Sequence, residues 1–153
     1  MKPEEIKRVA CVGGGVIGSS WAIQFAMKGL DVVLYDINDE QLAKSQAQMH
    51  KSLDALEQFK AVTPQRRQEI ADRVKLTTSM EEAVKNAQFI QESGPERLEI
   101  KRSILAQVEE YASADAIYAS STSGLLVSDI AAQAAHPERC VGAHPYNPPH
   151  LIP

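Results

Sequence analysis

The chain has 153 residues, of which 44% are hydrophobic and 24% are charged, a composition that suits one folded domain with a buried core. Its formal net charge is -4 and it contains no run of basic residues, so we expect no nucleic-acid partner. No apolar stretch approaches the roughly 20 residues that span a bilayer, and the acidic N-terminus lacks the apolar run of a secretory signal. We therefore expect a cytoplasmic protein without a membrane partner.

Six short apolar runs alternate with longer segments of helical period. Continuous runs of this kind are typical of strands that are covered on both faces, and they lie at residues 7–13, 31–36, 73–78, 87–93, 116–120 and 139–144. This order predicts an α/β fold, a Rossmann-type doubly wound and mostly parallel sheet, formed by residues 1–153 as one domain. The two cysteines, Cys11 and Cys140, lie in apolar runs without metal-ligand spacing, so we expect reduced thiols and no metal site.

A helix is expected directly after the first strand. Ile17, Trp21 and Phe25 recur there at intervals of four residues, which predicts one apolar stripe lying against the sheet.

The connection after the second strand is longer than a single helix needs. Leu42, Met49, Leu53 and Leu56 repeat with near-heptad spacing before a break around residues 59–67. This pattern predicts a helical-hairpin insertion that projects from the sheet or folds back on it.

A glycine pattern joins the first strand to its helix. In Gly13-x-Gly15-x-x-Gly18, the first glycine permits a tight turn, the second lets a pyrophosphate approach the backbone, and the third lets the helix pack close to the strand. The free N–H groups at the helix start, at Val16 and Ile17, would face the phosphates. The alternative is a glycine-rich turn without a ligand.

Asp36 follows about 20 residues later, at the end of the second strand, where an acid binds the ribose hydroxyls of a dinucleotide. A carboxylate there repels a 2′-phosphate, and no arginine is adjacent in the stretch YDINDE. The sequence therefore predicts NAD in preference to NADP, with FAD as the alternative cofactor of the same fingerprint.

Polar side chains follow the last two predicted strands. Residues 120–123 read SSTS, and His144 and Asn147 follow the final strand. Ligands of open α/β sheets bind at the carboxyl ends of the strands, so both segments should face the glycine loop. Hydride transfer from an alcohol needs a base, for which histidine is suited, and donors that hold the reacting oxygen. Each residue alone also fits a structural role, and His150 is a weaker candidate.

In combination these segments resemble the NAD-binding domain of the 3-hydroxyacyl-CoA dehydrogenase family. The resemblance includes GGGVIG, LYDIND, QESGPERLEIKRSILAQVE, ASSTSGL and HPYNPP, in family order. It implies oxidation of a small-molecule L-3-hydroxy substrate, a 3-hydroxyacyl-CoA or related 3-hydroxy acid, to the 3-keto product. It further implies His144 as general base, Ser123 and Asn147 as partners of the substrate oxygen, and Glu92 as an acid near the nicotinamide.

Two motifs depart from the acyl-CoA pattern. The loop reads His144-Pro-Tyr-Asn147-Pro-Pro where acyl-CoA enzymes usually have His-Phe-Phe-Asn-Pro, and the turn reads SSTSG where they favour SNTSS. This loop is more similar to the branch with lambda-crystallin, L-gulonate 3-dehydrogenase and carnitine dehydrogenase. The substrate thus stays open among acyl-CoA, carnitine and a sugar acid. Cations of the hairpin could contact CoA or form a solvated face: Lys60, Arg66, Arg67 and Arg73.

Two rival functions remain at this point. A non-catalytic, crystallin-like NAD-binding protein would not need a histidine, a serine and an asparagine together at the strand ends. A 3-hydroxyisobutyrate-type dehydrogenase would rely on a lysine in a later helix. In the family an all-helical C-terminal domain, absent from these 153 residues, follows this loop, closes the cleft and forms a homodimer. The resemblance thus implies a homodimeric full-length form, and a domain that alone binds NAD but turns over poorly.

Overall fold

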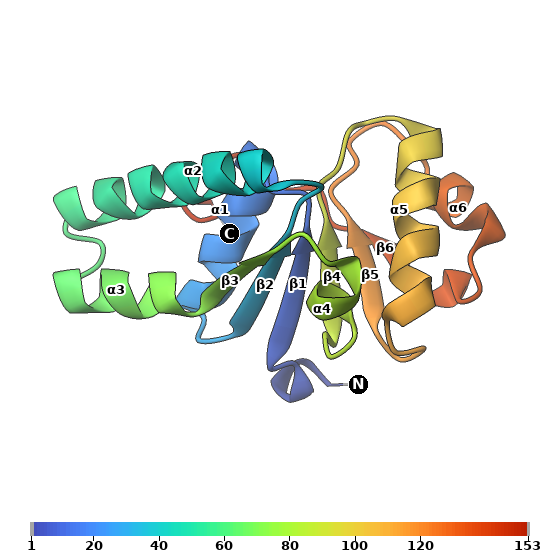
Figure 1. The fold of residues 1–153 in the computed structure, drawn as a ribbon, viewed down its shortest axis with the longest axis horizontal. Helices are drawn as coiled ribbons and strands as arrows, with labels where there is room; N and C mark the ends of the chain where they lie inside the picture. Colours follow the sequence, from blue (N-terminus) through green and yellow to red (C-terminus); the bar gives the residue numbers. More distant parts are fainter. Residues whose placement is uncertain (1, 153) are drawn as a thin grey trace.

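The computed structural model describes residues 2–152, and six parallel strands form its centre (Figure 1). The strands are β1 (Arg8–Val12), β2 (Asp31–Tyr35), β3 (Val74–Thr77), β4 (Phe89–Glu92), β5 (Ile117–Ser120) and β6 (Cys140–Gly142). Their order in the sheet is β3-β2-β1-β4-β5-β6. Every pair of neighbours is parallel, so the predicted doubly wound α/β fold is confirmed.

Helices connect the strands and cover the sheet. The α-helices are α1 (Val16–Met27), α2 (Asp39–Gln58), α3 (Pro64–Asp72), α4 (Met80–Val84), α5 (Leu98–Tyr111) and α6 (Val127–Ile130). Three short 3-10 helices are η1 (Pro3–Glu5), η2 (Ala131–Gln133) and η3 (Pro137–Arg139). None of the helices among the described residues is long and apolar enough to cross a membrane.

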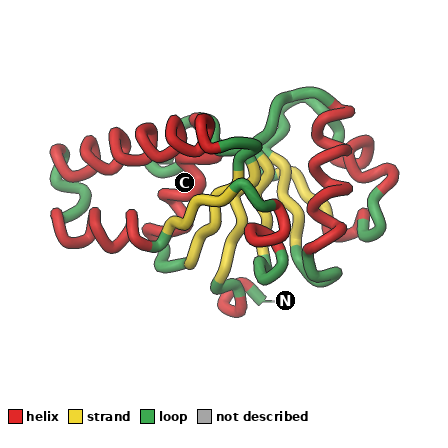
Figure 2. The backbone as a smooth tube through the Cα atoms, in the orientation of Figure 1, coloured by secondary structure: helices red, strands yellow, loops and turns green. Residues whose placement is uncertain are grey.

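Helices lie on both sides of the sheet (Figure 2). Each face has its own apolar core. Side chains alternate along a strand, so Val9 and Cys11 of β1 pack with α1, α2 and α3, whereas Ala10 and Val12 pack with α4, α5 and α6. The central strands β1 and β2 are thus buried on both faces, which explains their largely apolar runs. Cys11 and Cys140 are both free thiols, as expected.

The predicted helical hairpin is α2 and α3, joined by residues 59–63. It folds back on α1, and Leu42, Met49, Leu53 and Leu56 are all buried in that contact. The Thr63 side chain accepts a hydrogen bond from the backbone N–H of Arg66 and so caps α3. The hairpin therefore packs on the helical layer and makes the domain wider on the β3 side of the sheet.

The expected stripe on α1 packs against the core only in part. The buried face of this helix consists of Ile23 and of small residues, notably Ser19, Ala22 and Ala26. Ile17, Trp21 and Phe25 are only partly buried, and the Trp21 and Phe25 rings stack at 5.2 Å beside that face. The small residues let α1 lie close to the sheet, while Phe25 contacts Phe89 of β4 at 5.8 Å between ring centroids.

Candidate active site

The glycine loop brings α1 close to the end of β1. Gly13 has a φ of 98°, and a side chain at this position would also meet the carbonyl oxygen of Ser93 at 2.9 Å. A Cβ atom at Gly18 would overlap the carbonyl oxygen of Gly13. The first and third glycines therefore serve the turn and the close packing of helix on strand, the two roles expected of them.

Gly15 differs from the other two glycines of the motif because it borders open space. A Cβ atom built on this residue meets no protein atom within 4 Å, and the φ of -61° is one that any residue adopts. Gly15 is also the N-cap of α1 and offers no side chain to the helix. The N–H groups of the first turn have no intrahelical partners, so those of Val16 and Ile17 face open space beside Gly15. An anionic pyrophosphate fits this space and this partial positive charge.

Two serines fix the loop from outside it. The hydroxyls of Ser19 and Ser45 both donate to the carbonyl oxygen of Gly14, at 2.8 and 2.7 Å. Ser45 comes from α2, so the hairpin insertion takes part in holding the glycine loop. Nothing in the local sequence around Ser45 marks this contact, because it joins segments 31 residues apart.

Asp36 stands at the end of β2, beside the glycine loop. One carboxylate oxygen accepts from the Gly14 N–H at 2.8 Å and the other from the Ile37 N–H at 2.7 Å. These bonds hold the carboxylate at the edge of a cavity of about 750 Å³, which the glycine loop, Asp36 and one side of α5 line together. Ile100 and Ile104 contribute apolar surface there. The cavity has the position, the size and the carboxylate that an adenosine group requires.

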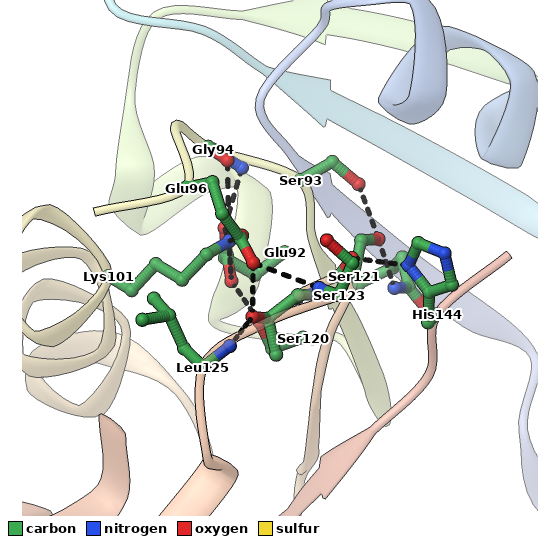
Figure 3. Close-up of polar contacts among 12 residues, drawn as sticks. Glu92, Ser93, Gly94, Glu96, Lys101, Ser120, Ser121, Ser123, Leu125 and His144 are labelled. Atoms are coloured by element: carbon green, nitrogen blue, oxygen red, sulfur yellow. Dashed lines mark hydrogen bonds and ion pairs between the residues drawn. The ribbon is translucent and has the colours of Figure 1, made fainter. Parts of the chain in front are cut away.

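Glu92, the acid expected near the nicotinamide, has a structural role in the described residues. Its side chain is fully buried, with 0% exposed, under the end of β4. Its oxygens lie 2.8 and 3.0 Å from the Lys101 Nζ, which is itself buried on α5. The Ser120 hydroxyl and the Gly94 N–H donate to the same carboxylate. Glu92 thus ties β5 and α5 to β4, and its carboxylate has no free side for a ligand (Figure 3).

Glu96 is the carboxylate on the open side of this cluster, with 44% of its side chain exposed. One oxygen accepts from the Thr122 hydroxyl at 2.6 Å and from the N–H groups of Ser123 and Gly124 at 2.9 and 3.0 Å. The other lies 3.5 Å from the Lys101 Nζ. Glu96 therefore holds the turn that carries Ser123, a role that sequence reasoning missed because two glutamates in QESGPE look equivalent.

The pKa of Glu96 should make the domain acid-sensitive. Partial burial raises this pKa, but the hydrogen bonds from Thr122, Gly124 and Ser123 and the charge of Lys101 outweigh it and lower the pKa to about 2. A lowered carboxyl pKa stabilises the fold above the unfolded value, and that contribution is lost as pH falls from about 4.5 toward 2.

We therefore expect wild type to exceed Glu96→Gln in unfolding free energy at pH 7, with the difference shrinking toward pH 2. Urea unfolding at several pH values measures it. A difference that does not vary with pH would contradict the role assigned to Glu96.

His144 follows β6 and meets the turn after β5. Its Nδ1 lies 3.1 Å from the backbone oxygen of Ser121, and the rest of the ring is exposed (Figure 3). Ser123 and Asn147 are also exposed. The structure thus brings His144 to the turn that carries Ser123, and Asn147 lies three residues farther along the histidine loop.

His150 has a definite place that the sequence did not reveal. Its Nδ1 lies 3.0 Å from the Ser20 hydroxyl, and both residues are buried. Burial lowers the pKa of this histidine. The loop after His144 therefore crosses the end of the sheet and docks on α1, which makes His150 a structural anchor.

Residues 8–153 match the family model described as 3-hydroxyacyl-CoA dehydrogenase, NAD binding domain. The chain belongs to this family. NAD is therefore the cofactor, and the FAD alternative falls away. The open space at Gly15, the helix start beside it and the carboxylate of Asp36 fit the pyrophosphate and the adenosine ribose of NAD.

Relatives and solved structures agree with the family. The chain is 42% identical to an L-carnitine dehydrogenase from Streptomyces griseus, covering 99% of this chain and 44% of the relative. It is also 44% identical to an L-carnitine dehydrogenase from Pseudomonas putida, and the match covers 97% of this chain and 45% of that relative. These relatives confirm the resemblance to the branch that includes carnitine dehydrogenase. A 3-hydroxybutyryl-CoA dehydrogenase structure from Escherichia coli K12 superposes with a TM-score of 0.89 at 30% identity. The match covers 94% of this chain and 30% of that structure's chain.

The chain spans less than half the length of these carnitine dehydrogenases, 44% and 45%. The helical C-terminal domain and the homodimer that the resemblance implies stay predictions.

Proposed function

We propose that this NAD-binding domain supplies the cofactor site and the general base of an enzyme that oxidises an L-3-hydroxy acid to its 3-keto product. Bound NAD would supply the hydride acceptor. The observation that supports this most is the contact from His144 Nδ1 to the Ser121 backbone oxygen at 3.1 Å. A carbonyl oxygen only accepts, so Nδ1 carries the proton and Nε2 keeps its lone pair.

Each residue of the site then has one task. Nε2 of His144 takes the proton of the substrate hydroxyl, and the Ser123 hydroxyl and the Asn147 amide hold the reacting oxygen. General-base catalysis of this kind typically contributes roughly 10²- to 10⁴-fold to the rate. The exposure of all three side chains leaves them free to meet a substrate.

The arginines of the hairpin favour a small acid over an acyl-CoA. Arg66 pairs with Glu69, and Arg73 pairs with Asp31. The remaining arginine, Arg67, lies between two acids, Asp54 and Glu57. CoA carries several negative charges, and these arginines are already neutralised by carboxylates of the same surface. Relatives from Streptomyces, Pseudomonas and Rhizobium, all named as L-carnitine dehydrogenases with or without a thioesterase, support a carnitine-like 3-hydroxy acid as the substrate class.

The test is an assay of NAD reduction with L-carnitine and with L-3-hydroxybutyryl-CoA. It is run on the chain alone and on the chain mixed with the unmatched C-terminal part of the Streptomyces griseus relative. We expect little turnover alone, faster turnover in the mixture, and a preference for L-carnitine. Faster turnover of the acyl-CoA would overturn the substrate class.

The role of His144 is tested in the same assay. His144→Gln should lower turnover by roughly 10²- to 10⁴-fold. NADH affinity should stay within about threefold, because His144 does not line the cavity beside the glycine loop and Asp36. An active His144→Gln protein would refute the general-base assignment.

A further inference from the structure

A buried amide lies under the candidate base. Gln91 is on β4 and its side chain is 1% exposed. Its Nε2 donates to the Ser121 hydroxyl at 2.8 Å and to the backbone oxygen of Ala143 at 3.4 Å. Ser121 belongs to the turn after β5, and Ala143 immediately precedes His144. One side chain therefore links the two segments that meet at the histidine.

Ser121 passes this restraint to the imidazole. Its hydroxyl is shared with Gln91 and with the Ser93 hydroxyl, which lies 2.9 Å away. Its backbone oxygen is the partner of His144 Nδ1. Figure 3 shows Ser93, Ser121 and His144 as one connected chain of polar contacts. A displacement of Ser121 would therefore move the only acceptor that Nδ1 has among residues 2–152.

The amide is not needed for the core. In the sheet, Gln91 is in register with Cys11 on β1 and with Ala119 on β5, and both are fully buried. An apolar side chain would suit such a place better, because a buried amide is costly unless it is fully hydrogen-bonded. The Gln91 Oε1 is buried and has no hydrogen-bond partner among the described residues. The unpaired Oε1 of Gln91 therefore destabilises the fold, whereas its Nε2 restrains the two segments that meet at His144.

We propose that Gln91 is a positioning residue that acts through Ser121 to hold His144 as its Nδ1–H tautomer, with Nε2 left as the acceptor. The inference rests on the proposed function, since it assumes that His144 is the base. A free histidine in water favours the opposite tautomer, so loosening Ser121 should release the ring to Nε2–H. In that state the nitrogen needed to take the substrate proton already carries one.

The test compares Gln91→Met with Gln88→Met. Methionine keeps the length of glutamine but cannot donate to Ser121 or Ala143. Gln88 is the matched control, because its Oε1 accepts from the Lys7 and Arg8 N–H groups at the other end of β4. Nitrogen-15 NMR of the 153-residue chain reports the tautomer of each histidine ring, and His144→Gln assigns the His144 signals.

We expect the His144 ring to be Nδ1–H in wild type and in Gln88→Met, and to shift to mostly Nε2–H in Gln91→Met. NADH affinity should stay within about twofold in all three, which shows that the glycine loop is intact. Ser121→Ala keeps the backbone oxygen but removes the hydroxyl link, so it should give a partial shift, and it replaces Gln91→Met if that variant does not fold. An unchanged Nδ1–H tautomer in the folded variant would overturn the proposal.

The two proposals fail in different ways. If His144→Gln does not lower turnover in the assembled enzyme, the general-base assignment is wrong whatever the tautomer does. If His144→Gln is inactive but the tautomer is unchanged in Gln91→Met, only the positioning role of Gln91 is wrong. When both hold, Gln91→Met should lower kcat by at least about tenfold and leave the KM for NAD unchanged.

Discussion

Gly15→Val is expected to abolish measurable NADH binding while the domain stays folded. The new Cβ atom meets no protein atom, and the backbone conformation suits any residue. Replacing glycine at an N-cap lowers the free energy of unfolding by about 1 kcal/mol at most. For a chain of this size, that corresponds to a fall in Tm of about 2–4 °C. The same side chain fills the space in which a pyrophosphate would approach the start of α1, so we expect at least about 100-fold weaker binding.

Gly18→Val is the matched control. Its side chain would overlap the Gly13 carbonyl oxygen, so α1 must move away from β1 and the fold itself should suffer. Nicotinamide fluorescence titration and thermal unfolding separate the two variants. NADH binding by Gly15→Val within about threefold of wild type would show that the phosphates do not approach this residue.

Lys101→Met should be the most destabilising single change on α5. It would leave the Glu92 carboxylate buried without its cation, and breaking a buried ion pair in this way typically costs about 3–5 kcal/mol. The turn that carries Ser123 should loosen as well, because Lys101 also lies 3.5 Å from Glu96. Urea unfolding of wild type and Lys101→Met measures the difference in unfolding free energy.

The double variant Glu92→Gln, Lys101→Met separates a lost ion pair from lost packing. Both ions are then absent, and part of the stability should return because no buried charge is left unpaired. Equal instability of the single and double variants would mean that the packing of the lysine stem, and not the ion pair, stabilises this region.

The sheet and the hairpin were predictable from the sequence because their signals are local. Apolar runs mark all six strands to within about two residues, and the leucines of α2 repeat along one face of a single helix. The face that α1 turns to the sheet was not predictable in this way. It depends on the close approach at Gly18, which favours Ala22 and Ala26 over Trp21 in the contact.

The candidate site was predictable where a motif has one meaning. The expected roles of Gly13, Gly18 and Asp36 follow from their order after a strand. The structure has the turn and the close packing at the two glycines, and it has the Asp36 carboxylate beside the glycine loop. Glu92 and Glu96 could not be told apart from the sequence. Burial decides their roles, and it depends on how Lys101 at the start of α5 packs against them. The contacts of Gln91 and His150 join residues 30 and 130 positions away, so no local pattern reports them.

The most direct test of the central claim is a titration of the chain with NADH and with NADPH, with Asp36→Ala beside wild type. For wild type we expect saturable NADH binding and at least about tenfold weaker NADPH binding. Asp36→Ala should lower NADH affinity by about 10- to 100-fold, which corresponds to the free energy that hydrogen bonds to a charged group usually contribute. The gap between the two nucleotides should narrow in the variant, because the carboxylate that repels a 2′-phosphate is gone. Equal binding of both nucleotides by wild type, or no effect of the substitution, would contradict the placement of the adenosine ribose at Asp36.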